Sequence, residues 1–164
     1  MVIGGQAVLV YGEPRLTKDI DITLGAGVDE LDTIVSLVRH LSLKILVDTF
    51  EDFVKKTMVL PVMDEKSGIR IDFIFSFSTY EQQAIERAKK VKISNTYVKF
   101  ASLEDVIIHK MIAGRARDIE DIKSMLLKNP KYRNQYIVKW LKAFDNSLGT
   151  NFIKSFKQIL KEIK

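Results

Sequence analysis

Apolar and polar residues alternate in two short stretches of the chain, residues 18–23 and 69–75. Such alternation is typical of a strand with one face in the core and one face outside it. Other stretches, such as residues 29–41, repeat apolar residues at helical spacing. The patterns predict strands at 1–3, 18–23, 43–48, 58–63, 69–75, 91–93 and 97–100, a short helix or turn at 50–56, and helices at 6–11, 29–41, 79–89, 102–114, 118–129, 134–146 and 151–163.

Strands therefore dominate the first part of the chain and helices the last part. This distribution predicts an α+β fold, with a mixed β-sheet flanked by helices and a C-terminal helical portion. We expect residues 1–100 to form the core around the sheet and residues 101–164 to form helices packed on it.

Residues typical of helix ends support the predicted helices of the C-terminal portion. Ser102 followed three positions later by Asp105 predicts a helix N-cap, and Gly114 predicts the end of that helix. Asp118 is a candidate cap of the next helix, which Pro130 terminates. In the strand at 58–63, Pro61 favours a sheet edge or a bulge, because proline has no N–H for a β-ladder.

The two alternating stretches also carry the candidate chemistry. Residues two apart on a strand project from the same face, so Asp19 and Asp21 should lie side by side. Asp72 is the only acid in the other stretch, where burial of a carboxylate without a partner is unfavourable. Carboxylates that repel one another at close range are stabilised by a cation, and Mg²⁺ prefers such oxygen ligands. The three acids therefore indicate a divalent metal site.

Simpler interpretations of these acids remain open. Alternate acids on a solvated strand face are common, so the Asp19–Asp21 pair alone is weak evidence for catalysis. Asp72 alone is also compatible with capping a strand end or pairing with Arg70.

Two adjacent glycines, Gly4 and Gly5, precede the acids at a fixed distance. Placed between a strand and a helix, they let the backbone approach a ligand closely and leave helical N–H groups for an anion such as a triphosphate. The motif is not a Walker loop, because no Gly-Lys-Ser/Thr follows, and it lacks the third glycine of a Rossmann fingerprint. The alternative is an ordinary tight turn.

Together these residues resemble the DNA polymerase β-type nucleotidyltransferase superfamily, whose pattern is a glycine pair, an hDhDh strand and a later hDh strand. The matching residues are Gly4, Gly5, Gln6, Ala7, Gly12, Arg15, Thr17, Asp19, Ile20, Asp21, Ile71, Asp72 and Phe73. A second stretch, residues 102–122 with Lys110 and Asp118, is similar to the AbiEii-like branch of minimal nucleotidyltransferases, which includes type IV toxin–antitoxin toxins.

The resemblance implies a nucleotidyltransferase fold, an NTP such as ATP as substrate and two Mg²⁺ ions, with Mn²⁺ as an alternative. It implies that Asp19, Asp21 and Asp72 bind metal, that Lys110 contacts nucleotide phosphates, and that Gly4, Gly5, Gln6, Arg15, Thr17 and Asp118 bind the nucleotide or border the active site. Many relatives carry serine at the second glycine, so Gly5 leaves only backbone contacts to the phosphates.

Other roles are open for three of these residues. Lys110 lies in an apolar helix, from which its side chain could extend to solvent instead of to phosphate. Arg15 could meet a triphosphate or pair with Glu13, and Asp118 could be a helix cap alone.

Charge is unevenly distributed along the 164 residues, which lack cysteine and any apolar run long enough for a membrane span. Residues 1–86 carry 8 basic and 14 acidic side chains, whereas residues 128–164 carry 9 and 2. The basic C-terminal segment suits a nucleic-acid backbone, although its lysines are more typical of the solvated face of a helix opposite Ile153, Phe156 and Ile159. No signal peptide is evident, and we expect a cytoplasmic protein without membrane contact.

We therefore predict a metal-dependent enzyme that transfers a nucleoside monophosphate from an NTP to an acceptor hydroxyl. The acceptor stays open among a tRNA end, another RNA and a protein side chain, and a small antitoxin is a possible partner. Two other functions are a non-catalytic nucleotide-binding partner subunit and a nucleic-acid-binding module, the second of which leaves Asp72 unexplained.

Overall fold

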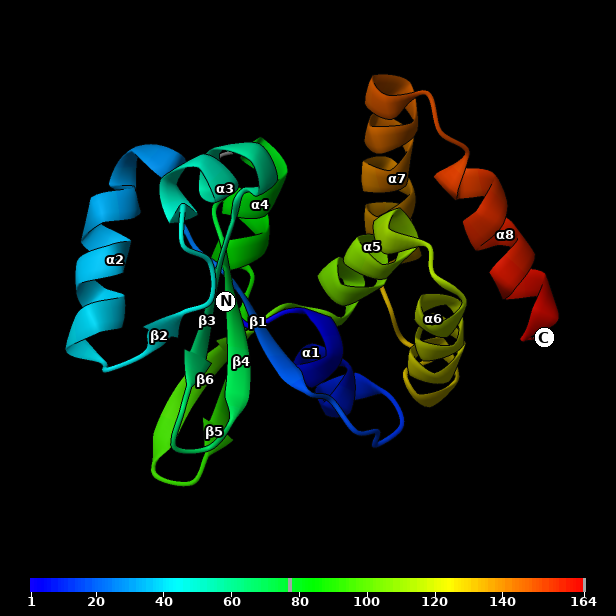
Figure 1. Ribbon diagram of the computed structural model, residues 1–164. Helices are drawn as coiled ribbons and strands as arrows, with labels where there is room; N and C mark the ends of the chain where they lie inside the picture. Colours follow the sequence, from blue (N-terminus) through cyan, green and yellow to red (C-terminus); the bar gives the residue numbers. More distant parts are fainter. Residues whose placement is uncertain (77, 164) are drawn as a thin grey trace. The chain divides into compact units, whose positions relative to one another are not determined.

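The computed structural model describes residues 1–76 and 78–163, which form two units (Figure 1). Unit 1 contains residues 1–6 and 16–101, and unit 2 contains residues 7–15 and 102–164. The second unit thus includes residues 7–15, which the sequence pattern assigns to the first part. Lys164, the last residue of the basic segment, lies outside the described residues.

Unit 1 is built on a four-stranded mixed sheet with the order β1-β4-β3-β2. Its strands are β1 (Asp19–Thr23), β2 (Lys44–Ile45), β3 (Val59–Asp64) and β4 (Ile69–Ile74). β1 runs parallel to β4, whereas β3 is antiparallel to both β4 and β2. Hence the two alternating stretches, residues 18–23 and 69–75, form adjacent strands although they are far apart in the sequence.

 The pairing aligns Asp19 with Arg70 and Asp21 with Asp72.

One face of this sheet carries the core of unit 1. The helices α2 (Leu31–His40) and α3 (Phe50–Thr57) cover that face (Figure 1). Their apolar side chains pack with those of β3 and β4 in a cluster of Leu31, Val35, Val38, Val54, Leu60, Val62, Phe73 and Phe75. Because side chains alternate along a strand, Asp19, Asp21, Arg70 and Asp72 project from the opposite face.

The rest of unit 1 contains a short 3₁₀ turn η1 (Val28–Glu30), the helix α4 (Thr79–Glu86) and a hairpin of β5 (Lys89–Ile93) and β6 (Thr96–Phe100). Ser78 caps α4 in a capping box with Glu81. The hairpin agrees with the predicted turn around Asn95, but β5 starts earlier than expected, so α4 is shorter than the predicted helix 79–89.

The first helix differs from its prediction. α1 spans Gly4–Tyr11, so the glycine pair lies in its first turn instead of preceding it. The expected strand at residues 1–3 is reduced to bridges from Val2 to Ile22 and Phe100. These bridges fix the start of α1 beside β1, and Ile3 N donates to Asp21 O at 2.9 Å.

Two predictions on the strands also need correction. β2 contains two residues and not the six of the predicted strand 43–48, because Leu46 already leaves the ladder after bonding Pro61 O. Pro61 lies between β4 and β2 in the sheet and not on an edge strand. Since β2 pairs only with Val62 and Met63, the missing N–H of Pro61 removes no bond from that ladder.

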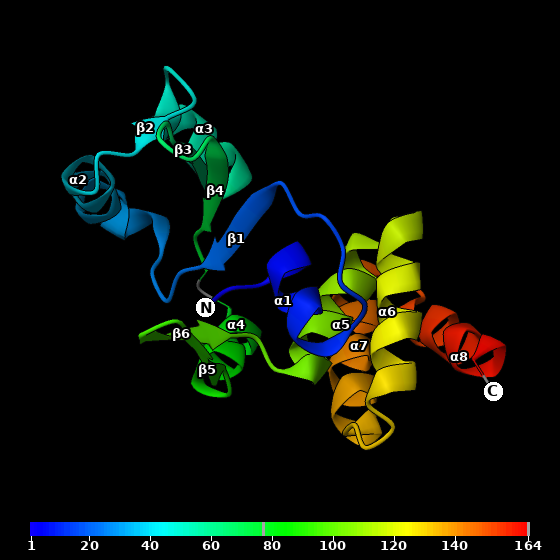
Figure 2. The ribbon, with the colours of Figure 1, turned by 90° about the horizontal axis from the view of Figure 1, so that it is seen from below.

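Unit 2 is a helical bundle around α5 (Leu103–Ala113), which contacts α6 (Ala116–Lys128), α7 (Asn134–Leu148) and α8 (Phe152–Glu162) (Figure 2). Its core combines apolar residues of all four helices, such as Ile107, Ile122, Leu141 and Phe156. The predicted apolar stripe of the last helix is confirmed, since Phe156 and Ile159 are buried while Lys154 and Lys157 are exposed.

The helix ends in unit 2 follow the local signals closely. Ser102 accepts a hydrogen bond from Asp105 N, and Gly114 ends α5 in the left-handed conformation with φ +63°. Asp118 is not the N-cap of α6 as predicted but its third residue, and its carboxylate accepts a hydrogen bond from Arg115 N at 3.2 Å. No helix within residues 1–76 and 78–163 is long and apolar enough to cross a membrane.

Candidate functional site

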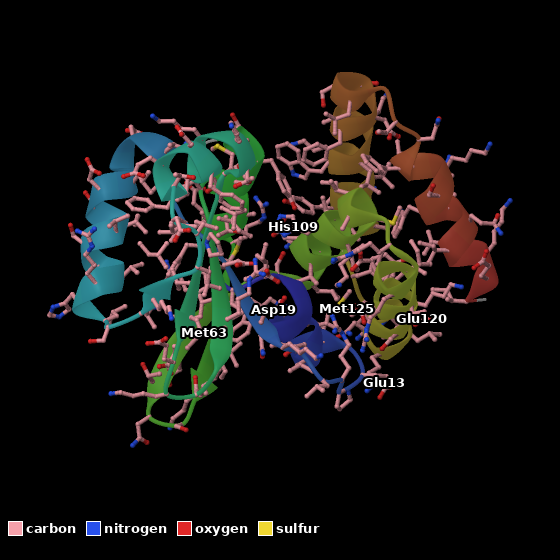
Figure 3. The ribbon with its side chains drawn as sticks, in the orientation of Figure 1. Glu13, Asp19, Met63, His109, Glu120 and Met125 are labelled. Carbon is pink, nitrogen blue, oxygen red and sulfur yellow. The ribbon has the colours of Figure 1, made fainter. Side chains whose placement is uncertain are left out.

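Three acidic side chains share the face of the unit 1 sheet opposite α2 and α3, which we call the acidic face (Asp19, Asp21 and Asp72). Asp19 and Asp21 lie two residues apart on β1, and Asp72 is the register partner of Asp21 on β4. Asp19, labelled in Figure 3, is half-buried, as are the other two acids. The strand pairing therefore brings the three predicted metal ligands onto neighbouring positions of one surface.

Arg70 is the basic residue of this surface. Its guanidinium makes a two-pronged ion pair with Asp72, with Nε–Oδ1 at 2.9 Å and Nη2–Oδ2 at 3.1 Å. The hydrogen bond to Asp72 raises the pKa of Arg70 above its ordinary value, and the charges of Asp72, Asp19 and Asp21 raise it further. The pairing of Asp72 with Arg70, one of the interpretations that the sequence left open, is thus present in the structure.

Gly4, the first residue of the glycine pair, lies against Asp21 of the acidic face. Gly4 has φ +61°, a conformation that glycine adopts without the steric penalty of a side chain. A Cβ atom at this position would collide with Asp21 Oδ2 and would lie 2.8 Å from Asp21 Cγ. Only glycine therefore lets the first turn of α1 approach the Asp21 carboxylate this closely.

Two more predicted site residues meet beside this turn. Gln6 Nε2 donates a hydrogen bond to Thr17 Oγ1 at 2.5 Å. This bond ties α1 to the segment that enters β1, so Gly4, Gln6, Thr17 and Asp21 all belong to one region of unit 1.

The donor chemistry of the acidic face suits a hard divalent cation, because carboxylate oxygens are preferred ligands of Mg²⁺ and Mn²⁺. Within residues 1–76 and 78–163, however, no three acidic or histidine side chains are gathered closely enough to hold an ion. At Asp72, both carboxylate oxygens accept hydrogen bonds from Arg70. The residues fit a metal by identity and strand position, and at Asp72 a metal ion would compete with Arg70.

The remaining predicted residues belong to unit 2, where they form a buried charge cluster (Lys110, Asp118 and Asp121, with Arg15 and Arg115 at its edges). Lys110 Nζ lies 2.6 Å from Asp118 Oδ1 and 2.7 Å from Asp121 Oδ2. Arg15 pairs with Asp121 at 3.2 Å, and Arg115 pairs with Asp118 at 2.7 Å. This cluster connects α5, α6 and the segment after α1.

These contacts exclude one of the open alternatives for Lys110 and one for Arg15. Lys110 is only 4 % exposed, so its side chain does not extend to solvent. Arg15 pairs with Asp121 and not with Glu13, which instead pairs with Lys128 at 2.8 Å. Glu13, like Glu120 and Met125 on α6, is labelled in Figure 3.

Asp121 contacts Lys110 directly, but the sequence pattern did not single it out as a candidate site residue. A signal for it exists, because Asp118 and Asp121 lie three residues apart on one helix face, and a lysine in an apolar helix requires buried anionic partners. The sequence pattern does not tell which acids pair with Lys110, because that depends on how α5 and α6 pack.

The buried charge cluster should make the protein sensitive to acid. Burial raises the pKa of Asp118, but the hydrogen bonds from Arg115 and Lys110 outweigh it and hold the pKa below its usual range. The resulting stabilisation is complete above the unfolded-state pKa of about 3.9 and is lost as the pH falls through the folded-state value. We expect the melting temperature of the wild type to fall more steeply below about pH 4 than that of Asp118→Asn. Parallel melting curves for the two proteins would contradict this assignment.

Comparison with known proteins identifies a family whose sequence model matches the chain. The sequence model of a family described as a nucleotidyltransferase of unknown function, DUF6036, matches residues 1–131. No curated protein matches the chain.

Two solved structures share the fold. The chain is similar to the solution structure of the antibiotic-resistance factor ANT(2'')-Ia, with 16% identity and a TM-score of 0.58, covering 89% of this chain and 80% of that chain. It is also similar to the crystal structure of an antigenic nucleotidyltransferase-like protein from Paracoccidioides brasiliensis, with 18% identity and a TM-score of 0.52, covering 98% and 83%. The α+β nucleotidyltransferase fold expected from the sequence is thereby confirmed. Because the family match spans most of the chain, the protein belongs to the DUF6036 nucleotidyltransferase family.

Proposed function

We propose that the protein transfers a nucleoside monophosphate from an NTP to an acceptor hydroxyl in a reaction that requires a divalent metal. The observation that carries the proposal is the contact of Gly4 with Asp21, on the face that also holds Asp19 and Asp72. It supports a phosphate-binding backbone next to metal-binding carboxylates, and the nucleotidyltransferase family supports nucleotide transfer in general.

The residues of unit 1 have distinct roles in this proposal. The first-turn N–H groups of α1, around Gly4 and Gly5, bind the triphosphate, because a helix N-terminus attracts anions. Asp19, Asp21 and Asp72 hold Mg²⁺ or Mn²⁺, which supplies charge neutralisation for the phosphates and activation of a hydroxyl. Gln6 and Thr17, through their mutual hydrogen bond, hold the glycine turn against β1.

The bond changes are those of a phosphoryl displacement. The acceptor hydroxyl gives its proton to water, and its oxygen forms a bond to the α-phosphorus of the NTP. The bond between the α-phosphorus and the bridging oxygen breaks, and pyrophosphate leaves with the electron pair. Asp19 and Asp21 concentrate negative charge where cations are needed for this step.

The nucleotide-binding roles of Arg15, Lys110 and Asp118 stay predictions from the resemblance. In unit 2 these side chains are engaged in the buried charge cluster, so a structural role of the cluster is established by its contacts alone.

We further propose an acceptor of RNA, and a toxin-like role in the AbiEii-like branch with a small antitoxin as partner. The support for RNA is the basic segment, whose exposed Lys154, Lys157 and Lys161 line a groove of about 910 Å³. The groove is also lined by Ile119 of α6 and by the acids Asp145 and Glu162. The test of the toxin-like role is growth arrest on expression of the wild type, relieved by Asp21→Asn and by a small protein encoded next to it.

The decisive experiment incubates the full chain with each of the four labelled NTPs, Mg²⁺ or Mn²⁺, and total RNA or cell lysate. We expect label to enter one class of macromolecule, and pyrophosphate to be released in equal amount. Label in RNA supports the RNA acceptor, and label in protein redirects the acceptor to a side-chain hydroxyl. Labelling that is unchanged in EDTA would contradict the metal requirement.

A nucleotide-binding subunit without transferase activity is the second candidate, and the Arg70–Asp72 ion pair favours it, because that pair occupies a metal-binding carboxylate. NTP binding without label transfer under every condition would support this candidate over the enzyme.

RNA binding should depend on salt if the basic segment contacts the acceptor. Replacing Lys154, Lys157 and Lys161 by Gln should weaken RNA binding, and each lost phosphate contact should flatten the plot of log affinity against log salt by about 0.7–0.9. Fluorescence anisotropy with labelled RNA measures the slope. The matched control replaces Lys55, Lys56 and Lys66, three exposed lysines of unit 1, and should bind like the wild type. Equal slopes for both variants would identify the α8 lysines as a solvated face.

A further inference from the structure

The acidic face contains its own cation. Arg70 lies two residues before Asp72 on β4, so both side chains project from the same face, and Arg70 is the register partner of Asp19 on β1. Its neighbours on this face are therefore acids on both strands. A guanidinium in that position neutralises charge that a divalent ion would otherwise neutralise.

The geometry of the ion pair is the strong form of an arginine–carboxylate contact. Both oxygens of Asp72 accept hydrogen bonds, at 2.9 and 3.1 Å, in the parallel fork arrangement that adds directional specificity to the charge attraction. Asp72 has 16% of its side chain exposed, so water competes less for it than for a fully solvated acid. A metal ion that approaches an oxygen of Asp72 therefore meets a positive guanidinium already bound to that carboxylate.

The side chain of Arg70 is also exposed enough to leave its ion pair with Asp72. Its side chain is 49% exposed, in contrast to Lys110 of the buried charge cluster at 5%. A half-exposed arginine can rotate into solvent at modest cost, because its charge remains hydrated there. The pair is therefore a contact that can exchange and not a permanent part of the core.

We propose that Arg70 competes with the divalent metal for Asp72 and so sets the metal concentration at which the site fills. The inference rests on the proposed function, since it assigns the metal to the same three carboxylates. With Arg70 paired, Asp72 is satisfied and the acidic face is partly neutralised without metal. A metal ion at Asp72 has to compete with the guanidinium charge, which lowers the apparent affinity for the ion.

The test measures Mn²⁺ binding to the full chain without nucleotide, by the loss of the free Mn²⁺ signal in electron paramagnetic resonance. Arg70→Gln removes the competing charge and the fork, and we expect the Kd for Mn²⁺ to fall about tenfold, the effect of one nearby positive charge at intermediate screening. Arg70→Lys keeps the charge without the fork, and it should give an intermediate Kd.

Two controls separate competition from general charge effects. Lys44→Gln removes one positive charge and an exposed ion pair with Glu65 from the far edge of the same sheet, and it should leave the Kd within twofold of the wild type. The double variant Arg70→Gln with Asp72→Asn should lose most of the gain in affinity, because the gain acts through Asp72. Thermal melting checks that each variant is folded.

The outcomes test competition by Arg70 and the proposed metal-dependent function separately. If the wild type binds Mn²⁺ and Arg70→Gln binds it equally well, Arg70 does not compete, and the proposed function is unaffected. If Lys44→Gln tightens binding as much as Arg70→Gln, the effect is one of net charge and the inference is overturned. If neither wild type nor Arg70→Gln binds Mn²⁺ at millimolar concentration, the metal site and the proposed function both fail.

Discussion

Asp21→Asn should abolish nucleotidyl transfer and leave the protein folded. The substitution preserves the shape of the side chain beside Gly4 and removes one charge from the acidic face. A loss of several kcal/mol of transition-state stabilisation corresponds to a fall in rate of about a thousandfold. In metal-free buffer, relief of repulsion between the carboxylates should leave the melting temperature unchanged or slightly raised. Label transfer and thermal melting on the same preparation measure the two effects.

Asp32→Asn is the matched control for this variant. Asp32 is an exposed acid on α2 of the same unit, and α2 packs on the opposite face of the sheet. Removing its charge should leave transfer at the wild-type rate. Full activity of Asp21→Asn would refute a metal-dependent mechanism on the acidic face.

Of all the variants proposed, Lys110→Met should cause the largest loss in the free energy of unfolding. It removes the ammonium group that lies between Asp118 and Asp121, both of which are buried. Deleting one partner of a buried ion pair leaves uncompensated charge and typically costs about 3–5 kcal/mol. Because Arg115 and Arg15 still contact the two acids, we expect about 3 kcal/mol, measured by urea denaturation.

Arg115→Gln provides the comparison. Arg115 contacts the same Asp118, but its side chain is 76% exposed. An exposed ion pair contributes about 0–1 kcal/mol, so this variant should lose no more than that. Equal losses for the two variants would show that the burial of Lys110 has no energetic consequence.

Local signals predicted much of the fold. The alternation around Asp19 and Asp72 predicted β1 and β4, and Ser102 and Gly114 predicted both ends of α5. These features succeed because each depends on residues close together in sequence: a strand needs alternation, and a cap needs one side chain near the helix end.

The partner of Lys110 was harder to predict, because it depends on which elements pack together: Lys110 engages Asp121 from the next helix. Asp72 engages Arg70 from its own strand, a pairing that the sequence offered as one of several interpretations. The helical start at Gly4 was also missed, since its φ of +61° and its contact with Asp21 arise from pairing of the first residues with β1. The residue types of the site were thus predictable, and the state of its carboxylates was not.

The buried charge cluster has a consequence for how this sequence can diverge. Losing Lys110 alone strands two buried acids, and losing either acid alone weakens the pairing of a lysine that is 4% exposed. Replacing a whole buried ionic set by apolar residues of similar volume is often neutral or stabilising. Positions 110, 118 and 121 should therefore be inherited as a set, so that homologues either keep the lysine with both acids or replace the three together.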